Sequence, residues 1–206
     1  MTIRRLTEPY DAEYERNAYD ADYYKNHTKY YEKAIPNFVT FMNDNFKFES
    51  IADIGCGTGA FVHPFEDTKK VLGFDFSVGS KAENVLKKKN YISTDISKEG
   101  ATEAAKDFDI AMSLETYEHI FPEFEKVYLS NIFGLNPKFV ILSCAEPGQI
   151  GRRHVNCKTK SDVIKIVKKL YPNYKVRKDL MEKFSKIKYL ASFYRKNTLI
   201  LQRHDK

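Results

Sequence analysis

The stretch from Ile51 to Gly59 constrains this chain more than any other part of the sequence. It reads Ile-Ala-Asp-Ile-Gly-Cys-Gly-Thr-Gly, a short apolar run that contains one acid and leads into a glycine-rich loop. The pattern predicts a buried β-strand that turns sharply into a helix, because glycine adopts backbone conformations closed to other residues and lets a ligand approach the main chain. A turn of this kind is where an open α/β sheet binds a nucleotide.

One interpretation of the loop is a dinucleotide site. The spacing Gly55-x-Gly57-x-x-Ala60 matches the dinucleotide fingerprint. Asp75 follows Gly55 by 20 residues, which is where an acid that binds the ribose is expected. A glycine-rich turn in some other α/β protein is a further possibility, since three glycines alone are weakly specific.

The second interpretation rests on a resemblance. Asp53, two residues before Gly55, and the tighter spacing Gly55-x-Gly57-x-Gly59 resemble the first motif of the class I S-adenosylmethionine (SAM) methyltransferases. In that family the loop lies under the amino-acid part of SAM, so no pyrophosphate has to be bound. The resemblance implies a SAM-dependent methyltransferase, and it extends over most of the chain from about Tyr19.

Predicted strands and helices alternate along the chain. Strands are expected at Ser50–Ile54, Val71–Phe74, Tyr91–Ser93, Phe108–Ser113, Phe139–Cys144, Tyr174–Arg177 and Thr198–Gln202. Helices are expected at 37–47, Ala60–Phe65, Ser80–Lys88, Ala101–Lys106, Phe124–Phe133, Ser161–Leu170 and Leu180–Tyr189. This alternation predicts an α/β fold with a doubly wound, mostly parallel sheet. Two closing strands resemble the seven-stranded methyltransferase sheet, whose last strand runs antiparallel.

A chain of 206 residues fits one domain with a full core. We expect a helical arm over residues 1–45 and a methyltransferase domain over 46–206. The arm is rich in tyrosine, with Tyr10, Tyr14, Tyr19, Tyr23, Tyr24, Tyr30 and Tyr31. In similar methyltransferases such an arm often forms a lid over the SAM site, and plain packing of the rings against the sheet is the alternative.

Composition points to a cytoplasmic protein. The longest apolar runs, such as Phe139–Leu142, are too short to span a bilayer. The first residues contain no apolar segment of a signal peptide. The 3 cysteines form no C-x-x-C pair, which argues against a disulfide framework or a cysteine zinc site and favours a reducing compartment.

Acidic residues follow the predicted strands. Asp75 ends the second strand, where a carboxylate can accept hydrogen bonds from a ribose diol, and Phe76 could pack on an adenine. Asp95 follows the third strand and resembles the acid that binds the adenine amino group in class I methyltransferases. Turn residues or helix caps are the alternative roles for both acids. The predicted cofactor-binding residues are Asp53, Gly55, Cys56, Gly57, Gly59, Asp75, Phe76, Asp95, Ile96 and Ser113.

A cluster of acids and histidine leaves the fourth strand. Glu115, Glu118 and His119 are spaced i, i+3 and i+4, which would place them on one face of a helical turn. Two carboxylates and an imidazole suit Mg²⁺, Mn²⁺, Fe²⁺ or Zn²⁺. A fourth ligand, His154, is available in the loop after the fifth strand, which opens on the same crevice.

This E-x-x-E-H element with a distant histidine resembles two groups of metal-dependent enzymes. They are the ubiquinone-biosynthesis O-methyltransferases and the plant small-RNA 3′-terminal 2′-O-methyltransferases. In both, a divalent cation held by two Glu and two His activates the accepting hydroxyl. The resemblance implies metal ligands at Glu115, Glu118, His119 and His154, with His119, His154 and Glu118 as catalytic residues. The loop around His154 also looks like uncharacterised bacterial and viral methyltransferases.

Two alternatives to a metal site remain. Acids near the start of a helix are stabilising against its dipole without any ion. His119 could instead act as a metal-free general base, a role that requires a pKa near neutrality. His27, His63 and His204 have no evident partners and are expected at the surface.

The charge distribution leaves the acceptor open. Residues Arg152 to Lys206 carry 17 Lys and Arg against 4 Asp and Glu, whereas the rest of the chain is net acidic. This asymmetry indicates an RNA 3′ end or cap as one acceptor, and simple solvation of exposed helix faces is the alternative explanation. The primary prediction is O-methylation of a small-molecule or sugar hydroxyl. An inactive SAM-binding subunit and a NAD-linked reductase are two competing hypotheses.

Overall fold

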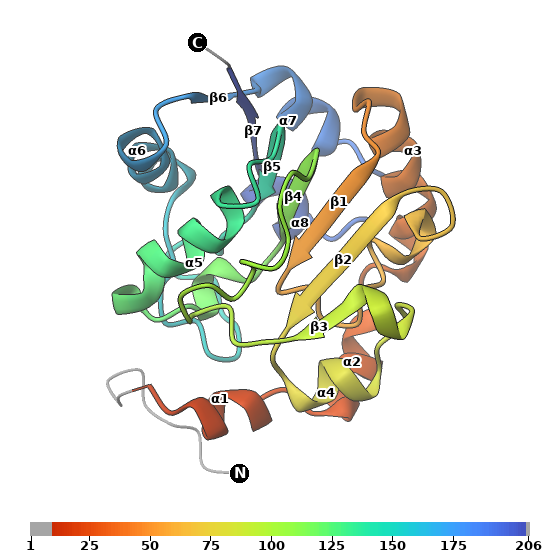
Figure 1. Ribbon diagram of the computed structural model, residues 1–206, viewed down its shortest axis with the longest axis vertical. Coiled ribbons are helices and arrows are strands. Elements are labelled where there is room, and N and C mark those ends of the chain that lie inside the picture. Colours follow the sequence, from red (N-terminus) through yellow and green to blue (C-terminus); the bar gives the residue numbers. More distant parts are fainter. Residues whose placement is uncertain (1–9, 205–206) are drawn as a thin grey trace.

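The computed structural model describes residues 10–204 and is built around a seven-stranded sheet (Figure 1). Its strands are β1 (Ser50–Ile54), β2 (Lys70–Asp75), β3 (Tyr91–Ser93), β4 (Ile110–Ser113), β5 (Phe139–Leu142), β6 (Tyr174–Val176) and β7 (Leu199–Arg203). Their order is β3-β2-β1-β4-β5-β7-β6. β1 to β5 pair in parallel, and β7 runs antiparallel to both of its neighbours. The predicted doubly wound sheet with an antiparallel last strand is confirmed.

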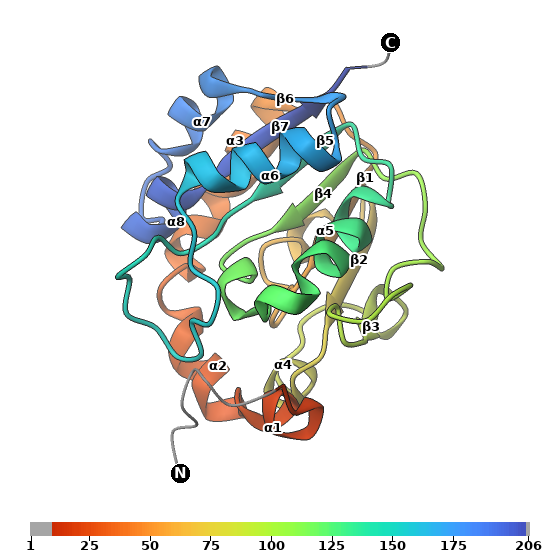
Figure 2. The same ribbon diagram turned by 90° about the vertical axis from the view of Figure 1, so that its left-hand side faces the viewer.

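Helices cover both faces of the sheet (Figures 1 and 2). The α-helices are α1 (Ala12–Asn17), α2 (Ala21–Thr28), α3 (Ile35–Asn45), α4 (Val78–Ala82), α5 (Glu125–Phe133), α6 (Lys160–Leu170), α7 (Lys178–Phe184) and α8 (Ser192–Asn197). Single 3-10 turns are η1 (Glu32–Ala34), η2 (His63–Phe65), η3 (Lys88–Asn90), η4 (Tyr117–His119) and η5 (Pro122–Phe124). α3 and α7 lie on one face, and α5 and α6 lie on the other.

The core is divided by the sheet into two apolar clusters. Successive side chains of a strand point to opposite faces, so Ile51 and Ala52 of β1 belong to different clusters. Ile51 shares its cluster with Phe38 of α3 and Phe184 of α7. Ala52 shares the other cluster with Tyr128 of α5. Both faces of each central strand are buried, so consecutive strand residues have to be apolar, as expected for a sheet covered on both sides.

α6 illustrates how local sequence specifies an element. The Thr159 side chain accepts a hydrogen bond from the Asp162 main-chain N–H and caps the first turn. Val163 and Val167 are buried on one face, while Lys165 lies exposed on the other. The observed helix begins one residue before the predicted one and ends at the same residue, Leu170.

Three predicted helices in the first half of the chain are wrong. Only the turn η2 forms within Ala60–Phe65, because Pro64 lacks the N–H that a longer helix would need. α4 replaces the helix expected at Ser80–Lys88, and the Asn84 side chain bonds both backbone groups of Leu86 to form a turn instead. The segment Ala101–Lys106 forms turns, with the Thr102 hydroxyl bonded to the Asn131 carbonyl of α5.

The helix expected at Leu180–Tyr189 is also divided. α7 ends at Phe184, and Tyr189 has a positive φ of 64°, which is incompatible with a continuing helix. α8 then precedes β7 and was not predicted at all. It brings Asn197 to the interior, where the side chain is 4% exposed.

The described part of the N-terminal arm lies across the ends of the strands. α1 and α2 contact α4 beyond the end of β2 (Figures 1 and 2). The Gly79 main-chain N–H of α4 donates to the Tyr19 carbonyl, which joins the arm to the sheet. The boundary at residue 45 and a lid function for the arm stay predictions. Within residues 10–204, no helix is long and apolar enough to cross a membrane.

Candidate functional site

A cavity of about 360 Å³ lies at the carboxyl ends of the parallel strands. Its walls include the glycine loop after β1, the segments that follow β2, β3 and β4, the N-terminal arm, part of α8, and the loop formed by residues 146–157, called here the 146–157 loop. Pockets of this size and position are typical of small-molecule sites in α/β sheets.

The glycine loop forms one wall as predicted. Gly55 and Gly57 have φ angles of 78° and 54°, which side chains rarely allow. A Cβ atom at Gly55 would overlap the Thr116 side chain, and one at Gly57 would lie 3.0 Å from the Tyr24 ring. Both glycines line the cavity together with Cys56. The main chain is therefore open to a ligand only because these positions lack side chains.

Two aspartates lie behind this loop. Asp75 Oδ2 accepts the Gly57 N–H at 2.9 Å, while Asp75 Oδ1 accepts the main-chain N–H groups of Phe76 and Ser77. The carboxylate lines the cavity, so Oδ2 has capacity for a further donor. Burial, and then the charge of Asp75, raise the pKa of Asp53 to about 8.

The far end of the cavity contains Asp95, Ile96 and Phe76. Asp95 accepts hydrogen bonds from the Tyr10 hydroxyl and, at 2.9 Å, from the Ser97 main-chain N–H. The arm therefore reaches the acid that was predicted to bind adenine.

Two predicted cofactor residues lie outside the cavity wall. Ser113 is fully buried, and its hydroxyl bonds the Ile54 carbonyl and the Tyr128 hydroxyl, so it joins β4 to β1 and α5. Gly59 packs against Leu86 with a φ of 80°. Both residues support the strand and turn that the cavity is built on.

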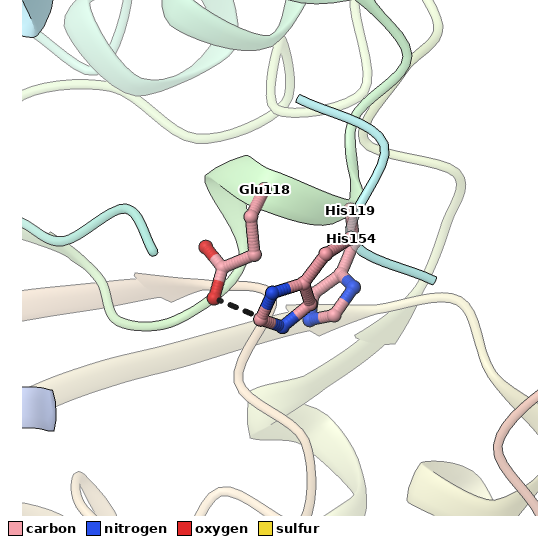
Figure 3. Close-up of side chains that lie close together, drawn as sticks. All are labelled: Glu118, His119 and His154. Atoms are coloured by element: carbon pink, nitrogen blue, oxygen red, sulfur yellow. Dashed lines mark ion pairs between the residues drawn. The ribbon is translucent and has the colours of Figure 1, made fainter. Parts of the chain in front are cut away.

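The chain places Glu118, His119 and His154 together at the other end of the cavity (Figure 3). One ligand atom from each lies within 4.8 Å of the others. Glu118 and His119 come from η4, which directly follows β4, and His154 comes from the 146–157 loop. The Glu118 carbonyl accepts the N–H groups of Val155 and Asn156 at 2.8 and 3.0 Å, which fixes the loop beside η4.

Main-chain carbonyls orient both imidazole rings. His119 Nδ1 lies 3.1 Å from the Arg153 carbonyl, and His154 Nδ1 lies 3.0 Å from the Gln149 carbonyl. A carbonyl can only accept, so each Nδ1 carries the proton and each Nε2 keeps a free lone pair. Tyr19 supports this arrangement, because its hydroxyl donates to the Arg152 carbonyl and lies 3.0 Å from His119 Nδ1. Histidines that bind metals are commonly oriented in this way.

The Glu118 carboxylate is exceptional among the described residues. Its side chain is 1% exposed, and neither oxygen has a hydrogen-bond partner within residues 10–204. Oε1 lies 4.0 Å from His154 Nε2. Burial, and then the charge of Glu115, raise the pKa of Glu118 to about 8. An isolated buried carboxylate is costly unless a cation or a donor satisfies it.

Glu115 does not share a helical face with Glu118 and His119. It precedes η4 and has a positive φ of 51°, so the predicted helical turn over the three residues is wrong. Its carboxylate lines the cavity but accepts hydrogen bonds from Ser143, Gln149 and Asn197. Glu115 is also absent from the three-residue cluster.

Several cavity residues were missed in the sequence. His27 lines the cavity and stacks on Tyr23 at 4.6 Å, although it was expected at the surface; the i, i+4 spacing of this pair on α2 was the available signal. Gln149 and Asn197 bind Glu115, but no local pattern marks them. His63 is about half exposed and pairs with Glu66, away from the cavity.

Comparisons with known proteins agree with this geometry. The family model described as methyltransferase domain matches residues 52–133, from β1 through α5. No curated protein matches the sequence. The match includes the glycine loop, Asp75, Asp95 and η4.

Solved structures share the fold at low identity. Magnesium protoporphyrin IX methyltransferase from Synechocystis PCC 6803, with bound SAM, is 17% identical with a TM-score of 0.65, over 96% of this chain and 99% of that chain. A SAM-dependent methyltransferase from Archaeoglobus fulgidus is 14% identical with a TM-score of 0.63, over 88% and 99%. The plantazolicin methyltransferase BpumL, in complex with a substrate analogue and SAH, is 15% identical with a TM-score of 0.59, over 89% of each chain. With the family match, this favours the SAM interpretation of the glycine loop over a dinucleotide.

Proposed function

From the premise that the chain is a SAM-dependent methyltransferase, we propose that it methylates a hydroxyl oxygen of a small molecule or sugar with the help of a divalent cation. Glu118, His119 and His154 would hold the cation. SAM would occupy the part of the cavity between the glycine loop and Asp95. The acceptor hydroxyl would enter between these two parts.

Carboxylates distributed along the cavity support this placement of SAM. Asp75 Oδ2 has capacity for a ribose hydroxyl, and Asp95 lies where it could accept the adenine amino group. Asp53 lies beside the glycine loop, where an ionised carboxylate would pair with the ammonium of the methionine part. Hydrogen bonds that involve a charged group are the stronger ones.

The observation that carries the metal proposal is the isolated carboxylate of Glu118 facing two histidines. Ligand atoms around one ion at about 2.1 Å lie no more than about 4.2 Å apart. The three observed atoms lie within 4.8 Å of one another, so small side-chain rotations would close the site. Burial, and then the neighbouring His154, lower the pKa of His119 to about 4. A neutral imidazole is the form that binds metal, whereas this pKa makes His119 a weak general base at neutral pH.

The donor set also indicates which ions fit. Two imidazoles and one carboxylate leave coordination positions open, as in sites that bind substrate directly. Imidazole ligands favour Mn²⁺, Fe²⁺, Co²⁺ or Zn²⁺ over Mg²⁺, which prefers oxygen. Mn²⁺ is therefore favoured over Mg²⁺ at this site.

The reaction would be a direct displacement. The acceptor oxygen forms a bond to the methyl carbon as the carbon–sulfur bond of SAM breaks, and the hydroxyl proton leaves to solvent. A bound divalent cation lowers the pKa of a hydroxyl that it coordinates. The chain supplies alignment, because η4 fixes the acceptor end and the glycine loop fixes the sulfonium end. The aromatic side chains of the arm, Tyr19 and Tyr23 among them, reduce the access of water.

The acceptor class is inferred from the residues that line the cavity. The solved relatives include enzymes named for a porphyrin and for plantazolicin, so the fold is compatible with chemically different acceptors. An RNA acceptor has one argument, the exposed Lys165, Lys168 and Lys169 of α6. These side chains do not line the cavity. A small acceptor that enters an aromatic cavity is therefore the preferred proposal.

The test measures SAH formation with a panel of catechols, sugars and short RNAs. Chelation with EDTA should abolish turnover while the calorimetric affinity for SAM stays unchanged. Mn²⁺ and Co²⁺ should restore turnover better than Mg²⁺. Glu118→Gln should be inactive, and Glu123→Gln, which alters an exposed acid of η5, should be normal. Turnover with any acceptor excludes an inactive SAM-binding subunit.

The metal-free alternative predicts a different pattern. With His119 as a general base, EDTA is harmless, His119→Ala is severe and His154→Ala is close to normal. A wild-type rate that survives exhaustive chelation, together with an active His154→Ala variant, would refute the metal proposal. Retention of RNA with a steep salt dependence, about −0.7 in log–log slope per phosphate contact, would instead favour the RNA acceptor.

A further inference from the structure

The Glu115 carboxylate is fully engaged by donors from three other parts of the chain. Ser143, after β5, donates to Oε1 at 2.8 Å and also accepts the Glu115 main-chain N–H at 2.6 Å. Asn197 of α8 lies 3.3 Å from Oε1, and Gln149 of the 146–157 loop lies 3.3 Å from Oε2. Glu118, three residues further along the chain, has no such partner within the described residues. The two acids of the E-x-x-E-H element therefore have different surroundings.

Gln149 is the residue that connects Glu115 to His154. Its side-chain N–H donates to Glu115, and its side-chain oxygen accepts from Asn197 at 2.9 Å. Its main-chain carbonyl accepts the N–H of His154 Nδ1 at 3.0 Å. The side chain of Gln149 thus anchors the loop, and its main chain orients the ring.

The surroundings of His154 leave little freedom once Gln149 is anchored. A Cβ atom at Gly151 would overlap the imidazole, so the ring lies directly against the loop backbone. The Cys157 thiol lies 3.7 Å from Nδ1, on the same side as the Gln149 carbonyl. Nε2 is left to face Glu118 (Figure 3).

We propose that Glu115 is a positioning residue for His154 and not a metal ligand. Its carboxylate acts through Gln149 and keeps the proton of His154 on Nδ1. The unprotonated Nε2 then faces Glu118. This inference rests on the proposed function for the identity of the metal site. The orienting contacts themselves exist in the protein without metal, so they can be tested separately.

The first experiment follows the His154 tautomer by long-range ¹H–¹⁵N NMR of the metal-free chain, with His154→Gln for assignment. The wild type should show the Nδ1–H tautomer. Glu115→Gln replaces one of the two acceptor oxygens by an N–H group, so one of the three donors loses its acceptor. The variant should release Gln149, which bonds Oε2 alone, and give a mixture of tautomers. Gln149→Ala should do the same. Glu146→Gln, at an exposed acid of the same loop, should match the wild type.

A rescue variant separates positioning from a general loss of structure. In the double variant Glu115→Gln, Asn197→Asp, position 115 supplies the N–H donor and position 197 supplies the carboxylate acceptor. The Gln149 amide can rotate so that its oxygen accepts from position 115 and its N–H donates to position 197. This double variant should restore the Nδ1–H tautomer. A merely structural role for Glu115 would not be reversed by placing a carboxylate on α8.

The second experiment measures Co²⁺ binding and its visible spectrum. Glu115→Gln should bind one Co²⁺ with the wild-type spectrum at about 10- to 100-fold lower affinity, as expected when an outer partner of a ligand is lost. The double variant should recover the affinity. If Glu115 is a ligand, its loss will change the spectrum and Asn197→Asp will not restore it, which would overturn the inference.

The outcomes for the two proposals are distinguishable. A wild type that binds neither Co²⁺ nor Mn²⁺ refutes the metal function, and the tautomer experiment still decides the role of Glu115. An unchanged His154 tautomer in Glu115→Gln and Gln149→Ala refutes the positioning role whether or not metal binds.

Discussion

Burial determines what the Glu118 carboxylate can do. In the unfolded chain it ionises above about pH 4.5, whereas burial raises its pKa in the folded protein to about 8. Between these values the folded state binds more protons than the unfolded state, so the free energy of unfolding falls as pH rises. His119 acts in the opposite sense between about pH 4 and pH 6.5, because its pKa is lowered from 6.5 to about 4.

Above pH 6.5 the effect of His119 has ended, whereas Glu118 and Asp53, whose pKa values are both raised to about 8, still titrate. We expect Glu118 to account for a loss of about 2 kcal/mol in the free energy of unfolding of the metal-free protein between pH 6.5 and 8, at about 1.4 kcal/mol per pH unit. Urea unfolding in EDTA at these two pH values measures the loss. Glu118→Gln should remove the contribution of Glu118 and leave that of Asp53, and saturating Mn²⁺ at the proposed site should reverse the contribution of Glu118, since a metal binds the ionised form of a carboxylate. Equal slopes for wild type and Glu118→Gln would show that this carboxyl is already ionised.

Gly151 offers a second test at the scale of one residue. A Cβ atom there would overlap the imidazole of His154. Gly151→Ala should therefore displace the ring and lower Mn²⁺ affinity at least about tenfold, comparable to the loss of an outer partner. SAM affinity should be unchanged. Calorimetry measures both, with Ile150→Ala, at a fully exposed neighbour, as the control. Wild-type Mn²⁺ affinity in Gly151→Ala would argue against His154 as a ligand.

Asp75 tests the cofactor end of the cavity. Asp75→Asn keeps the shape of the side chain but removes the charge that a ribose hydroxyl would meet. SAM affinity should weaken by about 1.5–3 kcal/mol, the range for hydrogen bonds to charged groups. Asp67→Asn, which alters an exposed acid paired with Lys87 at 2.7 Å, is the matched control. Identical calorimetric affinities for the two variants would remove Asp75 from the SAM site.

Among the elements, the 146–157 loop connects the most distant parts of the chain. Its Gln149 meets Glu115 and α8, its Arg152 donates to the Ala18 carbonyl at 2.8 Å, and its Arg153 pairs with Glu15 of α1. The pair is nearly buried, with side chains 7% and 12% exposed. The loop that orients the two histidines therefore also attaches the N-terminal arm.

Removal of one partner should detach the arm. Glu15→Ala leaves the Arg153 guanidinium buried without its carboxylate, which typically costs about 3–5 kcal/mol. We expect the cost to appear as local opening, with faster amide hydrogen exchange in α1 and α2 and unchanged exchange in β1 and β4. Glu13→Ala, at an exposed acid of the same helix, should not alter exchange. Uniform destabilisation of the whole chain would mean that the arm is an integral part of the core.

Ligand binding acts on the whole molecule, because the cavity joins the glycine loop, the arm and the 146–157 loop. At a concentration about 100-fold above its Kd, SAM should stabilise the folded state by about 2.7 kcal/mol. For a chain of this length that corresponds to a rise in Tm of roughly 5–11 °C. NAD at the same concentration should give no shift. A shift with NAD and none with SAM would reinstate the dinucleotide interpretation.

The charge asymmetry is also a property of the whole molecule. In the fold, some of the basic residues pair with internal partners and others are exposed on α6. Arg152, Arg153 and Lys158 are committed to internal partners, Lys158 to Glu125 at 3.1 Å. The exposed lysines of α6 lie on a helix that covers one face of the sheet (Figure 2). The cavity lies instead at the carboxyl ends of the strands. Much of the basic excess is therefore explained by solvation and internal pairing.

The sequence by itself determined the sheet and the cofactor. β1 and β3 have the bounds that were predicted, because short apolar runs between turn residues can be recognised locally. The glycine loop and the acids after β2 and β3 are specified by spacing alone, so the SAM interpretation needed no coordinates. Short helices were less predictable. α4 ends before Asn84, whose side chain bonds both backbone groups of Leu86, and η2 contains Pro64, which lacks the N–H that a longer helix would need.

Only the tertiary structure decided which of the acids and histidines lie close enough to form one cluster. Glu115 and Glu118 are equivalent in the sequence pattern, but a positive φ at Glu115 breaks the helical spacing and directs it to Gln149 and Asn197. Asn197 lies 82 residues away from Glu115, and no local periodicity encodes such a contact. The burial of Glu118 without a partner among the described residues likewise depends on chain segments that meet only after folding. Spacing specifies which side chains can reach the cavity, whereas long-range packing determines which carboxylate is buried without a hydrogen-bond partner among the described residues.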